Sequence, residues 1–69
     1  MSNQEKLQYY IVRKEKLMAA LNRNEFIQSD WVDFINDSRK DGMIAMSNDM
    51  EKRYVYYLKK KIQGANDDF

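Results

Sequence analysis

The segment NDMEKRYVYYLKKKIQ, residues 48–63, constrains the fold most, because its apolar side chains recur at the spacing of one helix face. That face consists of Met50, Tyr54, Tyr57, Leu58 and Ile62. Val55 and Tyr56 widen it on either side, beyond the width that a small helical bundle normally buries. We therefore predict a helix whose surplus of apolar surface faces outward, toward a partner.

The bounds of this helix are predicted from residues that favour helix ends. Asn48 and Glu51 have the spacing of a capping box, which predicts a helix that begins near Asp49. Gly64 is expected to end it. The four residues Met43–Met46 fit either a short extended link or an early helical turn, and the capping box favours the link.

A first helix is predicted over residues 3–22. Ser2 followed by Glu5 forms a capping-box pattern at its start. The apolar residues that then recur at helical spacing are Leu7, Tyr10, Ile11, Leu17, Met18 and Leu21. Polar residues at positions 22–24 favour a turn after this helix.

A short second helix is predicted between the two long ones. Phe26 and Ile27 precede it and are expected to anchor the connection in the core. Ser29 is the expected N-cap of a helix over Asp30–Ser38, and Gly42 is expected to end the helix with a positive φ. Its apolar face consists of Trp31, Phe34 and Ile35.

Together these segments predict an all-α fold, a small three-helix domain with long first and third helices and a short middle helix. The long helices are expected to be antiparallel, with Trp31 and Phe34 filling the gap between them. Trp31 is interpreted as the centre of the core rather than as an interface anchor. Residues 1–64 form the single predicted domain, and residues 65–69 an acidic, frayed tail.

The chain is too small to be strongly stabilised by its own core. A domain of 69 residues has a net stability of roughly 3–5 kcal/mol and usually needs a disulfide, a metal or a partner in addition. The sequence has no cysteine and no histidine, so disulfides and the usual zinc, haem and iron–sulfur ligand sets are ruled out. Oligomerisation is the remaining route.

The same inventory predicts a non-enzymatic protein with no cofactor and no metal. Histidine is the commonest general base and cysteine the most reactive nucleophile, and both are missing. The N-terminal sequence MSNQEKLQYY lacks the pattern of a secretory signal, and no apolar run approaches the length of a membrane span. We expect a cytoplasmic protein that does not enter a membrane.

Two segments with acidic residues are candidate metal sites. Residues 37–48, DSRKDGMIAMSN, partly resemble an EF-hand calcium loop, but Arg39 and Asn48 stand where carboxylates are required. We interpret this stretch as an interhelical turn. Asp30, Asp33 and Asp37 lie at helical spacing and are interpreted as a solvated face that can also meet a basic partner.

The predicted binding surface is built on the third helix. It consists of Tyr54, Val55, Tyr56, Tyr57, Lys59, Lys60 and Lys61. Tyrosine suits interfaces because its ring buries apolar area while its hydroxyl stays hydrated. We predict a protein-binding or regulatory module with a protein partner or a second copy as its ligand; the alternative that needs no partner is a monomer whose tyrosines are ordinary surface residues.

A small nucleic-acid-binding regulator is the second hypothesis, because basic side chains beside exposed aromatic rings suit single strands. The formal net charge of only +1 provides no global field for such binding. The lysines can also be explained by a favourable interaction with the C-terminal helix dipole. A helix-turn-helix unit fits poorly, since the connection is long and the third helix begins with the acidic sequence Asp-Met-Glu.

Overall fold

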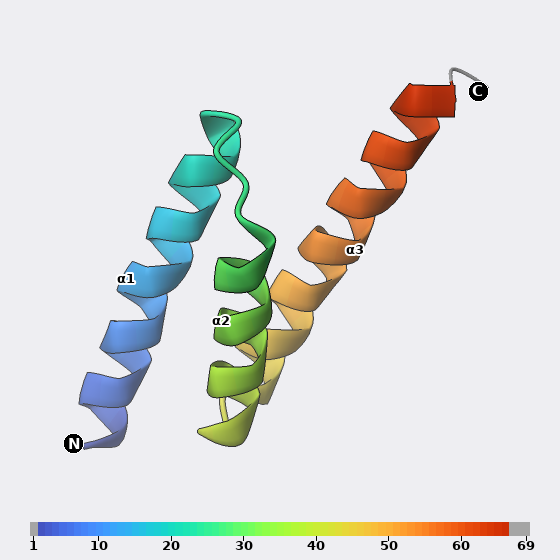
Figure 1. The fold of residues 1–69 in the computed structure, drawn as a ribbon. Helices are drawn as coiled ribbons and strands as arrows, with labels where there is room; N and C mark the ends of the chain where they lie inside the picture. The colour runs from blue at the N-terminus through green and yellow to red at the C-terminus, as the bar shows by residue number, and fades with distance from the viewer. Residues whose placement is uncertain (1, 67–69) are drawn as a thin grey trace.

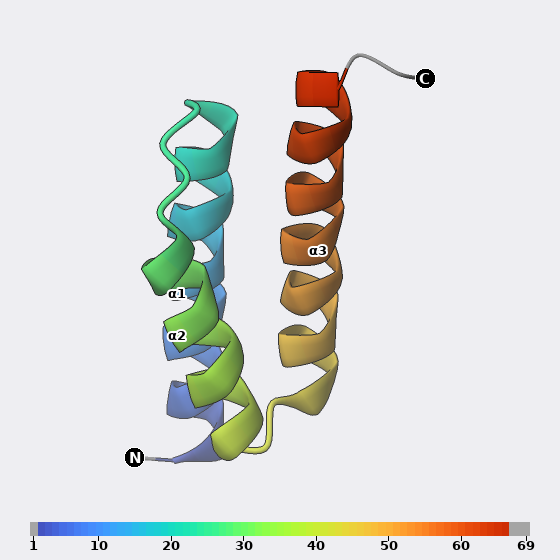
Figure 2. The same cartoon turned by 45° about the vertical axis from the view of Figure 1, so that its right-hand side comes forward.

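A computed structural model describes the backbone of residues 2–66 and the side chains of residues 2–62. Three helices, α1 (Asn3–Asn22), α2 (Gln28–Lys40) and α3 (Ile44–Asn66), confirm the all-α fold with long outer helices and a shorter middle one. The predicted antiparallel arrangement of the outer helices is wrong. Each connection reverses the chain, so α2 runs opposite to α1 and α3, and these two run in the same general direction (Figures 1 and 2).

The bounds of α1 agree with the prediction because local contacts fix both of its ends. The Ser2 hydroxyl accepts a hydrogen bond from the backbone N–H of Glu5 at 3.1 Å, as expected of an N-cap. At the other end the N–H of Arg23 bonds the carbonyls of Ala19 and Ala20. Asn24 then adopts φ 60°, a left-handed conformation that asparagine tolerates well.

The helix α2 is longer than predicted at both ends. It begins at Gln28, with Ile27 in the N-cap position, so the expected cap Ser29 lies within the first turn instead. It continues two residues past Ser38 to Lys40. The expected turn at Gly42 is confirmed, with φ 84°.

The third helix begins earlier than the capping box indicated. Residues 44–46 belong to α3, so the predicted link is wrong for them and Asn48 is no cap. The Asn48 side chain instead accepts a hydrogen bond from Arg39 at 3.3 Å. The helix ends at Asn66, past Gly64, so the first two residues of the predicted tail are helical, while residues 67–69 lie outside the described part.

The core lies around α2, which packs against both long helices. Its fully enclosed apolar residues are Tyr10, Trp31, Phe34, Ile35 and Met50. Trp31, 1% exposed, confirms its predicted place. One prediction fails: Ile27 is 54% exposed although it was expected in the core.

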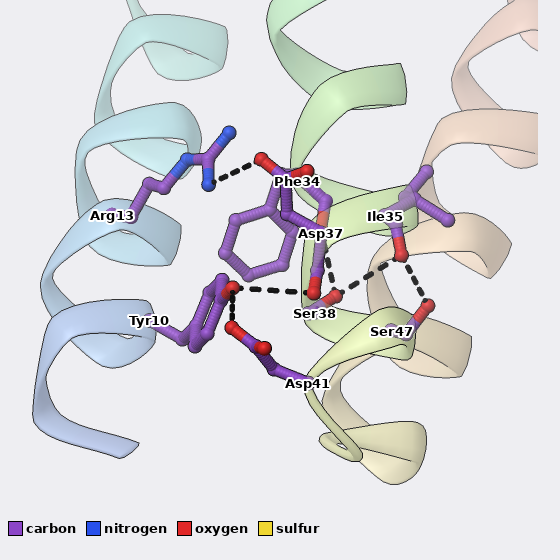
Figure 3. A network of polar contacts seen from close by, with 8 residues as sticks. All are labelled: Tyr10, Arg13, Phe34, Ile35, Asp37, Ser38, Asp41 and Ser47. Atoms are coloured by element: carbon purple, nitrogen blue, oxygen red, sulfur yellow. Dashed lines mark hydrogen bonds and ion pairs between the residues drawn. The ribbon is translucent and has the colours of Figure 1, made fainter. Parts of the chain in front are cut away.

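A polar network explains why Tyr10 is buried (Figure 3). Its hydroxyl donates to the backbone carbonyl of Asp37 at 3.2 Å and to the carboxylate of Asp41. These bonds give the buried hydroxyl its hydrogen-bond partners at the α1–α2 boundary. The Asp37 carboxylate in turn pairs with Arg13 on α1 at 3.0 Å. Burial, together with the hydrogen bond to Asp41, raises the pKa of Tyr10 to about 12.

Of two buried serines, Ser47 joins α3 to α2 and Ser38 makes its hydrogen bonds within α2. The Ser47 hydroxyl donates to the carbonyl of Ile35 at 2.8 Å, and the Ser38 hydroxyl donates to the carbonyl of Phe34 at 2.7 Å (Figure 3). Within the described side chains, no buried polar atom lacks a hydrogen-bond partner. The first turn of α3 is therefore held to α2 by a tertiary contact rather than by a side-chain cap.

Stability should fall with pH in the alkaline range because of Tyr10. The unfolded tyrosine ionises near 10 and the folded one near 12, so the native state holds its proton longer and the stabilisation is complete below pH 10. The free energy of unfolding then falls by up to about 3 kcal/mol as the pH rises through the pKa of the folded protein.

The urea midpoint of the wild type, followed by circular dichroism between pH 8 and 12, measures this loss. The variant Tyr10→Phe isolates the effect of this one residue. It should be about 1–2 kcal/mol less stable at neutral pH, because two hydrogen bonds are removed. At the alkaline end this disadvantage should vanish and then reverse, because only the wild type loses stability through Tyr10. A constant difference between the two proteins across this range would contradict the assignment.

Candidate functional site

The seven residues of the predicted surface all lie on α3 but face different ways. Tyr54 and Tyr57 are half-buried, and their rings stack on Phe26 of the α1–α2 connection, with centroids 5.9 and 4.3 Å away. Phe26 also lies 5.6 Å from Trp31, which links this stack to the core. Tyr54 and Tyr57 thus hold α3 to the connection, which leaves only part of each ring for the contact predicted for them.

Val55 and Tyr56 are the outward-facing members of the set. Val55 is 41% exposed and Tyr56 65% exposed, as their positions at the margins of the apolar face indicated. The Lys60 ammonium lies 5.8 Å from the centroid of the Tyr56 ring, within range of a cation–π contact. This pair places an aromatic ring and a positive charge together on the surface of α3.

The three consecutive lysines, Lys59–Lys61, are exposed on α3 before its last turn. The last turn of the helix contains no basic residue, because α3 continues to Asn66. The helix dipole acts mainly within the last turn, so it explains these lysines less well than the sequence suggested. Their charge remains available for a contact.

A groove of about 560 Å³ runs between the C-terminal part of α1 and the middle of α3. Its lining residues are Met18, Leu21, Asn22, Lys52, Arg53, Tyr56, Tyr57 and Lys60. Met18 and Leu21 are half-buried and pack against the edge of the core. The sequence predicted both as apolar face residues of the first helix but could not place them beside the basic residues of α3.

One ion-pair cluster joins the two helices beside this groove. The Lys14 ammonium on α1 lies 2.9 Å from the Asp49 carboxylate on α3, and Arg53 lies 3.2 Å from the same carboxylate. The hydrogen bond from Lys14 lowers the pKa of Asp49 below its usual range, and Arg53 acts in the same direction. Part of the Arg53 charge is therefore compensated within the protein.

A second hollow, of about 350 Å³, lies on the other side of Tyr56. Its lining residues are Glu51, Lys52, Val55, Tyr56 and Lys59. Glu51 pairs with Arg39 of α2 at 3.1 Å, so this hollow contains an acidic side chain. Tyr56 and Lys52 line both hollows, which makes the Tyr56 ring the shared wall of the two.

The residues that resemble a calcium loop are divided between two helices, and the aspartates Asp30, Asp33 and Asp37 all lie on α2. Asp37 and Arg39 lie within α2 and Asn48 lies within α3, so residues 37–48 do not form one calcium-binding loop. Asp30 and Asp33 are exposed on α2. Across the described part of the chain, no three acidic side chains gather as a metal site would require.

Comparisons of the chain with protein-family models, with curated proteins and with solved structures gave no significant match. Among residues 2–66, no helix has both the length and the hydropathy that crossing a bilayer requires.

Proposed function

We propose that this protein is a small non-enzymatic module that binds another protein, or a second copy of itself, through α3. The contact surface is centred on Tyr56 and Val55, with the basic edge Lys59–Lys61 beside them. The exposure of the Tyr56 ring, 65%, carries the proposal, because a large ring between two hollows offers area on both sides to a partner. Tyr54 and Tyr57 hold α3, and with it this surface, in place through their stacking on Phe26.

The size of the core supports a binding role as well. Only five apolar side chains are buried among the described residues, and a partner that binds the native state alone would add stability by mass action. Leaving Val55 and Tyr56 exposed gives the isolated chain no packing benefit, whereas an interface would bury them. A homodimer and a heteromeric complex both satisfy this argument.

The variant Tyr56→Ala tests the proposal. It should weaken partner binding by at least about tenfold, as expected for a central interface tyrosine, while the thermal midpoint stays within a few degrees of the wild type. Binding is measured by affinity capture from nuclease-treated lysate of the organism that encodes the chain, and self-association by sedimentation velocity. The matched control is Tyr9→Ala, which removes an exposed tyrosine of α1.

Retained capture by Tyr56→Ala would contradict the proposed surface. A wild-type protein that is strictly monomeric and captures no protein would contradict the proposed function as a whole.

A nucleic-acid-binding regulator is the second candidate, supported by the pairing of Lys60 with Tyr56. Such a protein should bind a single-stranded oligonucleotide, with log K falling by about 0.7 per log unit of salt for each phosphate contact. Capture that is lost after nuclease treatment, together with this steep salt dependence, would favour the second candidate over the first.

A further inference from the structure

The floor of the α1–α3 groove is apolar and fixed in place. Met18 and Leu21 project from α1, and Tyr57 projects from α3 with its ring stacked on Phe26 at 4.3 Å. The stack holds the Tyr57 ring before any ligand arrives, which reduces the entropy lost on binding. Methionine adapts its shape to different apolar side chains, so Met18 allows the groove to accept apolar residues of different shapes.

The rim of the groove is positively charged. Lys52, Arg53 and Lys60 line it, and no acidic side chain is among the described residues that do so. Arg53 shares the carboxylate of Asp49, whereas Lys52 and Lys60 take part in no ion pair within the described part of the chain. Since the whole chain has a net charge of only +1, this is a local concentration of charge that selects an anionic occupant.

The spacing of the lining residues fits a helix as the occupant. On α3 they are residues 52, 53, 56, 57 and 60, which span about 12 Å at the 1.5 Å rise of a helix. An amphipathic helix laid into such a groove presents anchors at positions i, i+3 or i+4, and i+7 over a similar length. Acidic residues beside those anchors would then meet the two lysines of the rim.

The geometry points to an acidic amphipathic helix of a partner protein as the ligand of the α1–α3 groove. This inference rests on the proposed function and adds the chemistry of the partner. A nucleic acid is less favoured, because one face of each lining tyrosine is engaged, Tyr57 by Phe26 and Tyr56 by Lys60. A second copy is less favoured, because the exposed apolar patch of α1 around Tyr9 and Val12 is bordered by two basic residues, Arg13 and Lys16, and by only one acidic residue, Glu5.

The probe is a helix-stabilised peptide of about 14 residues with leucine at the three anchor positions and glutamate on both flanks. A matched peptide has lysine in place of each glutamate, and an oligothymidylate of similar charge serves as the nucleic-acid probe. Titrations are followed by NMR at the methyl groups of Met18 and Leu21. The glutamate peptide should bind and shift both methyl signals, and the lysine peptide should not.

Charge reversal on the rim provides the second arm. Lys60→Glu should lower the affinity for the glutamate peptide by about tenfold or more, and it should allow the lysine peptide to bind. The matched control is Lys40→Glu, at an exposed lysine of α2 that lines neither the groove nor the second hollow and is not part of the proposed contact surface. It should change affinity by less than about threefold. Circular dichroism confirms that both variants keep the fold, since both lysines are exposed.

Any of three titration results would overturn the inference: equal binding of the two peptides, binding that Lys60→Glu and Lys40→Glu weaken equally, or displacement of the glutamate peptide by the oligonucleotide. Loss of the binding signal through self-association would also overturn it, in favour of a second copy as the occupant. If Tyr56-dependent protein capture persists while the glutamate peptide fails to bind, only the chemistry of the occupant is wrong. If both fail, the proposed function is wrong.

Discussion

Trp31→Ala is expected to leave the chain largely unfolded at room temperature. The Trp31 ring is 1% exposed and packs at the centre of the core, 5.6 Å from Phe26. Truncating a buried tryptophan to alanine costs roughly 3–5 kcal/mol, which includes the cavity left behind. A chain of this size has a net stability of only roughly 3–5 kcal/mol, so the substitution removes about as much free energy of unfolding as the protein has.

Far-UV circular dichroism and urea titration measure this effect. Trp31→Phe serves as the control, because a smaller aromatic ring keeps most of the packing and should leave a folded protein with a lower urea midpoint. Tyr56→Ala, at an exposed ring, should keep both the spectrum and the midpoint. A native helical spectrum for Trp31→Ala would contradict the central position of this ring and revive its interpretation as an interface anchor.

The sequence predicts best those features that are set by neighbouring residues. The bounds of α1 agree with the prediction because Ser2 and Glu5 make the cap through contacts three residues apart, and a regular apolar stripe follows. The turn at Gly42 agrees because a positive φ is a local property of glycine. The number and order of the helices follow from such signals.

Features that depend on contacts between distant residues could not be predicted. Ser29 and Asn48 have the chemistry of caps, but Ile27 occupies the N-cap position of α2 and α3 begins four residues before Asn48. The predicted direction of α3 relative to α1 is also wrong, because capping and periodicity contain no information on how helices pack. Tyr10 is buried through partners about 30 residues away, at Asp37 and Asp41.

The candidate site also contains features that local sequence sets and features that depend on distant residues. The outward position of Val55 and Tyr56 was predictable, because their angular positions place them at the margins of the α3 apolar face. The stacking of Tyr54 and Tyr57 on Phe26 was not predictable, because Phe26 lies in another segment of the chain. The α1–α3 groove depends on the placement of two helices that are 21 residues apart in the chain, between Asn22 and Ile44, and no periodicity indicates it.

Ser47→Pro distinguishes the observed start of α3 from the start that the capping box indicated. In the structure the N–H of Ser47 donates to the carbonyl of Met43 at 2.9 Å, inside the first turns of the helix, and its hydroxyl donates to Ile35. Proline would remove both bonds and clash with the preceding turn, at a cost of about 3 kcal/mol or more. We expect loss of most of the helical signal in circular dichroism.

Ile44→Pro is the control, because Ile44 is the first residue of α3 and proline is well tolerated at that position. Its side chain is exposed, so little packing is lost, and the urea midpoint should change slightly. If α3 instead began near Asp49, residue 47 would precede the helix and both proline variants would fold. Equal stability of the two variants would therefore contradict the structure at this point, whereas unfolding of Ser47→Pro alone means that the Ser47–Ile35 contact overrides the capping signal at Asn48.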